Sequence, residues 1–195
     1  MYPGNIELLA TKHIEKYTES GCKEILIERA RALKNNIKDG EWKFSIPRAH
    51  PLTFIKYEAN QMINISCIIE GKEKEITKHN MELQVCSYYE KKKIFEFHID
   101  LKNPEAKIPE PINHLHVLGY DVPRFPFPPM DIILLCEFVL INFFPEESEK
   151  LRKDPTWKRM VLNSQRIFVE PYFEKCQKCL DNEKETLMGH LISLS

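Results

Sequence analysis

This chain of 195 residues has no long hydrophobic run, and it contains only six glycines. Its most apolar stretch, residues 130–144, is shorter than the roughly 20 apolar residues that a membrane-spanning helix needs. The stretch is also interrupted by Asp131, Glu137 and Asn142. The first residues show no basic segment followed by an apolar one, so no secretory signal is expected. We therefore expect a cytoplasmic protein without a membrane partner.

Disulfide-forming cysteines and excess charge are lacking as well. Most of the six cysteines stand singly in apolar or strand-like sequence, which indicates reduced thiols rather than a disulfide scaffold. Twenty-eight Lys and Arg against 29 Asp and Glu leave the chain nearly neutral, which excludes a surface built as a whole for nucleic acid. Any contact with RNA must then be local. The length favours a single domain over residues 1–195, and the abundance of Lys, Ile, Asn and Glu points to a bacterial gene.

The first part of the chain changes from helical to strand periodicity. Residues 1–38 carry apolar side chains at helical spacing and predict a helical N-terminus. From residue 41 the apolar period becomes two. Residues 41–118 therefore predict an antiparallel β-meander, because the strands follow one another without helices between them. Within this meander, residues 70–72 and 90–93 predict turns.

Helical spacing returns after residues 104–129, where prolines predict an extended segment or a loop. Residues 130–181 predict the C-terminal helices, and the most apolar of these should be buried against the sheet. Asp154 followed by Pro155 predicts the start of a second helix, and Ser164 is predicted to cap a third. The fold class predicted is α+β, with N-terminal helices, an antiparallel β-meander and C-terminal helices packed on the sheet.

The residue types that carry chemistry are concentrated in Pro-Ile-Asn-His-Leu-His-Val at residues 111–117. In a strand, His114 and His116 leave on the same face. On the preceding predicted strand, the alternation places Glu96, His98 and Asp100 together on the face opposite to the apolar side chains. If the two strands pair, Glu96, His98, His114 and His116 can form one cluster.

Two kinds of chemistry fit such a cluster. Three neutral imidazoles, or two with a carboxylate, suit zinc or another divalent metal that keeps one position open for water. Without a metal, one histidine can act as general base and another as general acid, while Arg124 binds a phosphate through two hydrogen bonds. That arrangement suits metal-independent cleavage of RNA. The competing structural interpretation is that histidines beside a proline-rich segment hydrogen-bond only backbone carbonyls.

Two features near the end of the chain carry weaker signals. Cys176 and Cys179 have a spacing seen in zinc sites, but only His190 lies near them to complete a ligand set. Two apolar positions on a helix explain the pair better. Residues 187–194 are more hydrophobic than a frayed terminus, and we expect them to dock on their own domain or on a partner.

Residues 93–146 combine Phe-Glu-Phe-His, Pro-Ile-Asn-His-Leu-His-Val, Pro-Arg-Phe-Pro and an apolar helix that ends in Phe-Phe-Pro. This combination resembles the core of small bacterial α+β proteins such as the TumE-type toxins of toxin–antitoxin pairs and their relatives in defence islands. The resemblance implies a toxin-like or anti-phage defence effector that acts on RNA, with an antitoxin or a defence-complex subunit as protein partner. It carries the site onto His114, His116 and Arg124.

The order of a helix, a four-strand meander, a proline-rich segment and further helices is also similar to the ubiquitin-conjugating and RWD folds. A conjugating enzyme needs a nucleophilic cysteine in the exposed loop after the meander. No cysteine occurs between Ser87 and Leu135, and Cys136 lies within the most apolar predicted helix. Under this alternative the protein is a non-catalytic, partner-binding subunit of a larger bacterial defence assembly.

Overall fold

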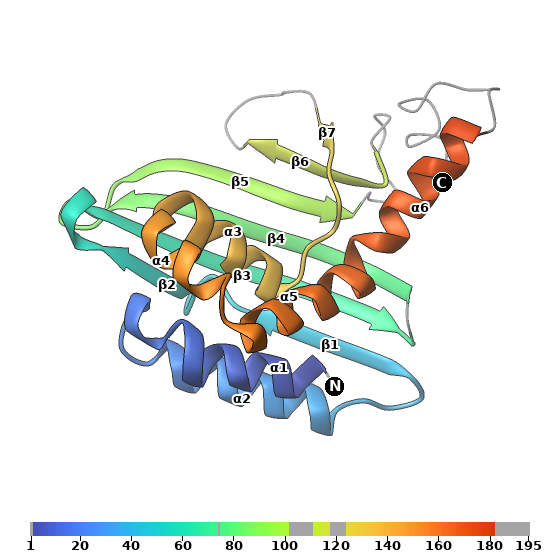
Figure 1. The fold of residues 1–195 in the computed structure, drawn as a ribbon, viewed down its shortest axis with the longest axis horizontal. Helices are drawn as coiled ribbons and strands as arrows, with labels where there is room; N and C mark the ends of the chain where they lie inside the picture. Colours follow the sequence, from blue (N-terminus) through green and yellow to red (C-terminus); the bar gives the residue numbers. More distant parts are fainter. Residues whose placement is uncertain (1, 74, 102–110, 118–123, 182–195) are drawn as a thin grey trace.

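A seven-stranded antiparallel sheet with helices before and after it forms the part of the chain that the computed structural model describes, residues 2–73, 75–101, 111–117 and 124–181 (Figure 1). The elements in chain order are α1 (Tyr2–Leu8), η1 (Leu9–His13), η2 (Glu15–Tyr17), α2 (Cys22–Asn35), β1 (Glu41–Ile46), β2 (Leu52–Lys56), η3 (Tyr57–Ala59), β3 (Gln61–Lys72), β4 (Glu75–Ser87), β5 (Lys93–Leu101), β6 (Asn113–Val117), β7 (Phe125–Pro126), α3 (Ile132–Phe143), α4 (Pro145–Leu151), α5 (Pro155–Phe168) and α6 (Glu170–Asp181). The predicted α+β class is confirmed.

The strands are arranged in the order β1-β3-β4-β5-β6-β7, and β2 also pairs with β3. The turn predicted at residues 70–72 is wrong, because β3 continues to Lys72 with a bulge between Glu70 and Gly71. Gly71 serves packing instead: a Cβ atom there would collide with the indole of Trp42, its neighbour across β1 and β3. The charged turn predicted at 90–93 does separate β4 from β5, except that Lys93 begins β5.

The proline-rich segment contributes a strand that sequence periodicity does not reveal. Phe125 and Pro126 form β7, which pairs with β6 at the edge of the sheet. An edge position tolerates proline, since a residue there needs no ladder donor on its outer side. β7 thereby places the residues that follow Arg124 beside β6, the strand that carries His114 and His116.

The sequence predicted the start of α5 at Asp154, but it did not mark the capping residue of α3, and its prediction for the third helix is wrong. Asp131 caps α3, where its Oδ1 accepts a hydrogen bond of 2.8 Å from the Leu134 N–H, and Asp154 caps α5. Ser164 does not cap a third helix; it lies inside α5 and is buried. Its position continues the apolar stripe of Trp157, Met160 and Val161, so its small side chain packs inward. The next helix, α6, begins at Glu170.

The two faces of the sheet differ in chemistry. Figure 1 shows α3, α4 and α5 lying across one face. The alternation of side chains turns the apolar members of the strands toward these helices, as in the T-shaped contact of Phe97 with Phe138 at 5.7 Å between ring centres. Buried side chains of this face are Phe44, Ile46, Phe54, Ile63, Ile65, Ile69, Met81, Leu83, Phe97 and Ile99. Of the helices described, none has the length and apolar character needed to cross a bilayer.

Burial of α3 can be tested with one substitution at a buried position and one at an exposed position of this helix. Leu134 is 5% exposed, and Ile141 on the same helix is 42% exposed. An unpaired buried charge costs several kcal/mol against a total stability of roughly 5–15 kcal/mol. We expect Leu134→Asp to abolish cooperative thermal unfolding, measured by circular dichroism, whereas Ile141→Asp should shift stability by less than about 1 kcal/mol. Equal stability of the two variants would contradict this placement of α3.

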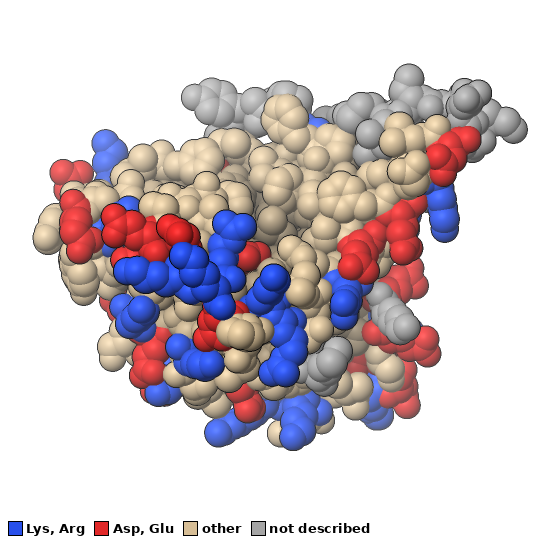
Figure 2. Space-filling view, in the orientation of Figure 1, with Lys and Arg blue, Asp and Glu red and all other residues tan. Residues whose placement is uncertain are grey.

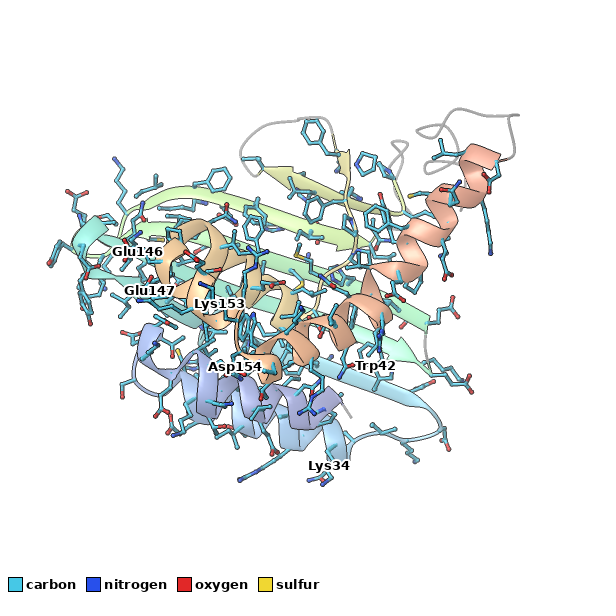
Figure 3. All side chains as sticks on the ribbon, viewed as in Figure 1. Lys34, Trp42, Glu146, Glu147, Lys153 and Asp154 are labelled. Carbon is cyan, nitrogen blue, oxygen red and sulfur yellow. The ribbon has the colours of Figure 1, made fainter. Side chains whose placement is uncertain are left out.

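His13 joins the N-terminal helices to α5. Its ring is 2% exposed and stands edge-on to the indole of Trp157, with ring centres 5.3 Å apart. The ion pair of Lys12 with Asp154, at 3.3 Å, lies beside it, and Figure 3 shows Asp154 at the start of α5 next to these helices. Burial lowers the pKa of His13 below 6.5; Asp154 raises this pKa and Lys12 lowers it further.

This lowered pKa makes stability depend on pH. As the pH falls below the unfolded value of about 6.5, the unfolded chain binds the proton before the folded chain does. The free energy of unfolding should therefore decrease from that pH down to the folded pKa of His13, and this group should have no such effect above it. We expect His13→Phe to show a shallower decrease in urea unfolding between about pH 7 and pH 5. Identical pH profiles for both proteins would show that His13 is not buried in its neutral form.

Candidate functional site

Polar side chains of β4, β5 and β6 meet on the sheet face that points away from the core. The strand register aligns Glu82, His98 and His116 across the three strands. The next rung aligns Asn80, Asp100 and His114. We define the imidazole–carboxylate cluster as Glu82, Glu96, His98, Asp100 and His116.

The accessible end of the cluster is the pair Asp100 and His116. His116 Nε2 lies 2.7 Å from Asp100 Oδ2, and the Asn80 amide donates a 2.6 Å hydrogen bond to Asp100 Oδ1. The side chains of Asp100 and His116 are 17% and 20% exposed. The pair is therefore held in a fixed orientation and can still be reached from solvent.

His98 connects this pair to the buried end. Its Nε2 atom lies 3.1 Å from Glu96 Oε1 and 3.7 Å from Glu82 Oε2, while its Nδ1 atom lies 4.0 Å from Asp100 Oδ2. The centres of the His98 and His116 rings are 5.2 Å apart. Nε2 of His98 thus faces Glu96 and Glu82, and Nδ1 faces Asp100.

Cations compensate the two buried carboxylates. Lys93 donates a hydrogen bond to Glu96 Oε2. The guanidinium of Arg48 contacts Glu82 Oε2 as an ion pair, although without hydrogen-bond geometry. Burial raises the pKa of Glu96, but hydrogen bonds from Lys93 and His98 outweigh burial and hold this pKa below 4.5. Glu96 is therefore ionised at neutral pH.

His114 stands beside the cluster with a different partner. Its Nδ1 atom lies 3.0 Å from the backbone carbonyl oxygen of Pro111, and the residue is 3% exposed. Its ring centre is 5.6 Å from that of His116, so the two histidines share a face, as the sequence predicted. This contact with backbone fits the structural interpretation, and the predicted catalytic role of His114 stays a prediction.

The structure brings four of the five predicted residues together: Glu96, His98, His114 and His116. The fifth, Arg124, is half-buried and directly precedes β7. Extending the pairing of Leu115 with Phe125 by one residue places Arg124 opposite His116. The prediction that it binds phosphate stays a prediction.

Sequence reasoning did not assign Glu82 or Asp100 to the site. A signal for Glu82 was present, because Met81 and Leu83 point into the core and the residue between them must point to the other face. Asp100 was placed on the polar face by the same alternation, yet its contact with His116 depends on strand register. Arg48 comes from the connection between β1 and β2, and no periodicity marks it.

Donor atoms in the cluster lie close enough to hold a metal ion. In two groups of three, one donor atom from each residue lies within 4.8 Å of the others: His98, Asp100 and His116, and also Glu82, Glu96 and His98. Among the residues that the structure describes, these are the groups with that geometry, and Cys176 on α6 belongs to neither. His190 and the apolar residues 187–194 lie outside the described residues.

Known proteins give no assignment for this chain. No family model matches it, and neither a curated protein nor a solved structure matches it. The resemblances to TumE-type toxins and to RWD folds therefore stay predictions.

The contact between Asp100 and His116 can be measured by a double-mutant cycle. Residues in direct contact usually show coupling energies of about 0.5–3 kcal/mol, whereas distant residues are additive to within about 0.5 kcal/mol. We expect coupling in that range between Asp100→Asn and His116→Ala in urea unfolding. The control pair is Asp100→Asn with Lys153→Ala, whose side chain is exposed in the turn between α4 and α5, and it should be additive. Additivity of the first pair would contradict the geometry of the cluster.

Proposed function

We propose that this protein is a bacterial effector of the toxin or anti-phage defence type that cleaves RNA at the imidazole–carboxylate cluster. The observation that carries the proposal is the oriented, partly exposed pair of Asp100 and His116 beside a second imidazole, His98. Charged groups cost free energy when they leave water, so a fold does not gain stability from gathering them on three strands. Such clusters are more frequent at functional sites.

The cluster contains the groups that RNA cleavage requires. In this reaction a base takes the proton of the ribose 2′-hydroxyl, the 2′-oxygen forms a bond to phosphorus, the bond from phosphorus to the 5′-oxygen breaks, and the 5′-oxygen takes up a proton. As a neutral imidazole oriented by Asp100, His116 can accept the first proton. The 5′-oxygen can then take up, through a water molecule, the proton that His116 has accepted, while His98 lies beside this ring with ring centres 5.2 Å apart. If a divalent ion occupies the same donor atoms, the ion stabilises the phosphate instead.

Positive side chains border the cluster. Arg48 and Lys93 are 67% and 55% exposed, so each can contact a phosphate beyond its carboxylate partner. Arg124, opposite His116 by extension of the register, is the predicted phosphate ligand. On the helical face, by contrast, Figure 2 shows Lys and Arg lying among Asp and Glu, which gives that face no uniform attraction for RNA.

A second candidate function is a partner-binding subunit of a defence assembly. Helix α6 leads away from the sheet in Figure 1. It presents Phe173 and Leu180 at 56% and 58% exposure. Exposed apolar side chains of this kind favour contact with a protein partner, such as an antitoxin or another subunit.

Expression in bacteria separates the two candidates. We expect the wild-type protein to arrest growth and degrade RNA, and both effects should disappear in His116→Ala and Asp100→Asn. The stability of these variants should stay within about 1–2 kcal/mol of the wild type, because catalytic residues carry little of the fold. His50→Ala, a histidine exposed in the loop after β1, is the matched control and should remain toxic.

Two results would remove the catalytic proposal. One is toxicity that survives both cluster substitutions. The other is toxicity that occurs without RNA degradation and disappears in Phe173→Ser or Leu180→Ser. That result would assign the protein to partner binding.

A further inference from the structure

We infer that His98, Asp100 and His116 bind one divalent transition-metal ion of the zinc class. His98 and Asp100 lie on β5, and His116 lies on β6, which pairs with it. Their three donor atoms converge on one face of the sheet. A tetrahedral ion with bonds of about 2.0–2.1 Å separates its ligand atoms by roughly 3.3 Å. Asp100 Oδ2 lies 2.7 Å from His116 Nε2, which is shorter than that value, and 4.0 Å from His98 Nδ1, which is longer. Small side-chain rotations therefore suffice to complete the site.

Glu96, which contacts Nε2 of His98, supports this assignment. A neutral imidazole has one N–H and one lone pair. A carboxylate oxygen of Glu96 lies 3.1 Å from Nε2 and accepts a hydrogen bond there, so it holds the proton on Nε2 and leaves the lone pair on Nδ1, which faces Asp100. Histidine ligands of metals commonly donate their second N–H to a carboxylate in this way. Asn80 orients Asp100 through its other oxygen in the same manner.

The alternative group of Glu82, Glu96 and His98 is unsuited to a cation. Arg48 and Lys93 already neutralise its two carboxylates, and a metal ion would have to displace both or lie beside them. Its carboxylate side chains are 4% and 5% exposed, which leaves no open coordination position. Asp100 differs from these two carboxylates, because its ion-pair partners among the described residues are the histidines His98 and His116. We therefore assign Glu96 to the orientation of a ligand.

The donor set defines the class of ion. Two imidazole nitrogens and one carboxylate oxygen suit zinc and other first-row divalent ions, whereas magnesium and calcium prefer oxygen ligands throughout. The partial exposure of Asp100 and His116 leaves room for a water or substrate ligand, as in catalytic zinc sites. Use of the ion as a Lewis acid for a phosphate oxygen rests on the proposed function, whereas binding of the ion does not.

Zinc and cobalt ions added to the full chain after chelator treatment test this inference. We expect one ion per chain in calorimetry and in metal analysis after dialysis, and cobalt absorption bands typical of nitrogen and oxygen ligands without a thiolate band. Asp100→Asn and His116→Ala should each weaken binding by more than about 100-fold, and Glu96→Gln by roughly 10–100-fold, as for other partners of metal ligands. His50→Ala is the control and should bind as the wild type does. Circular dichroism checks that each variant folds. If His116→Ala unfolds, Asp100→Asn still tests the site, because asparagine preserves the shape of the aspartate side chain.

The outcomes separate the ion from the proposed function. Unchanged affinity in Asp100→Asn and Glu96→Gln, or the absence of binding by the wild type, would overturn the metal site. RNA cleavage that persists in chelator and still requires His116 would overturn use of the ion and leave the proposed function standing. Zinc binding with the expected losses, but without RNA cleavage, would confirm the metal site and reject the proposed function.

Discussion

The pairing register of β4, β5 and β6 is the constraint on which both the core and the candidate site depend. Side chains alternate between the faces of a strand, so a slip by one residue exchanges the two faces completely. In the observed register, Leu83 and Phe97 meet in the core while Glu82 and His98 meet on the opposite face. A slip would bury charged groups under the helices and expose apolar ones. The hydrophobic effect that fixes the core thereby also fixes the cluster.

The charges of the cluster are arranged so that the fold can carry them. The buried carboxylates have nearby cations, and the pair of Asp100 and His116 keeps contact with solvent. This division gives the cluster a closed end, where Glu96 orients His98, and an accessible end, where a ligand can enter. The proposed zinc site and the proposed RNA cleavage both require that division, whereas a scaffold would be served as well by apolar side chains of similar size.

Local patterns predicted the elements, and long-range contacts account for what they missed. The helix start at Asp154 follows from capping chemistry, and the shared face of His114 and His116 follows from the strand period. Gly71 suggested a turn because glycine is common in turns, but the indole of Trp42 occupies the space above it. Ser164 suggested a cap, yet it fills a buried position in α5. The contact of Arg48 with Glu82 requires three-dimensional placement that no local pattern contains.

Crystals of the protein soaked in a zinc salt test the central claim most directly, because anomalous scattering locates the ion without reference to activity. We predict one strong peak at about 2.0–2.2 Å from His98 Nδ1, an oxygen of Asp100 and His116 Nε2. A peak between Glu82 and Glu96, or a cluster that stays empty while zinc binds elsewhere on the chain, would contradict it.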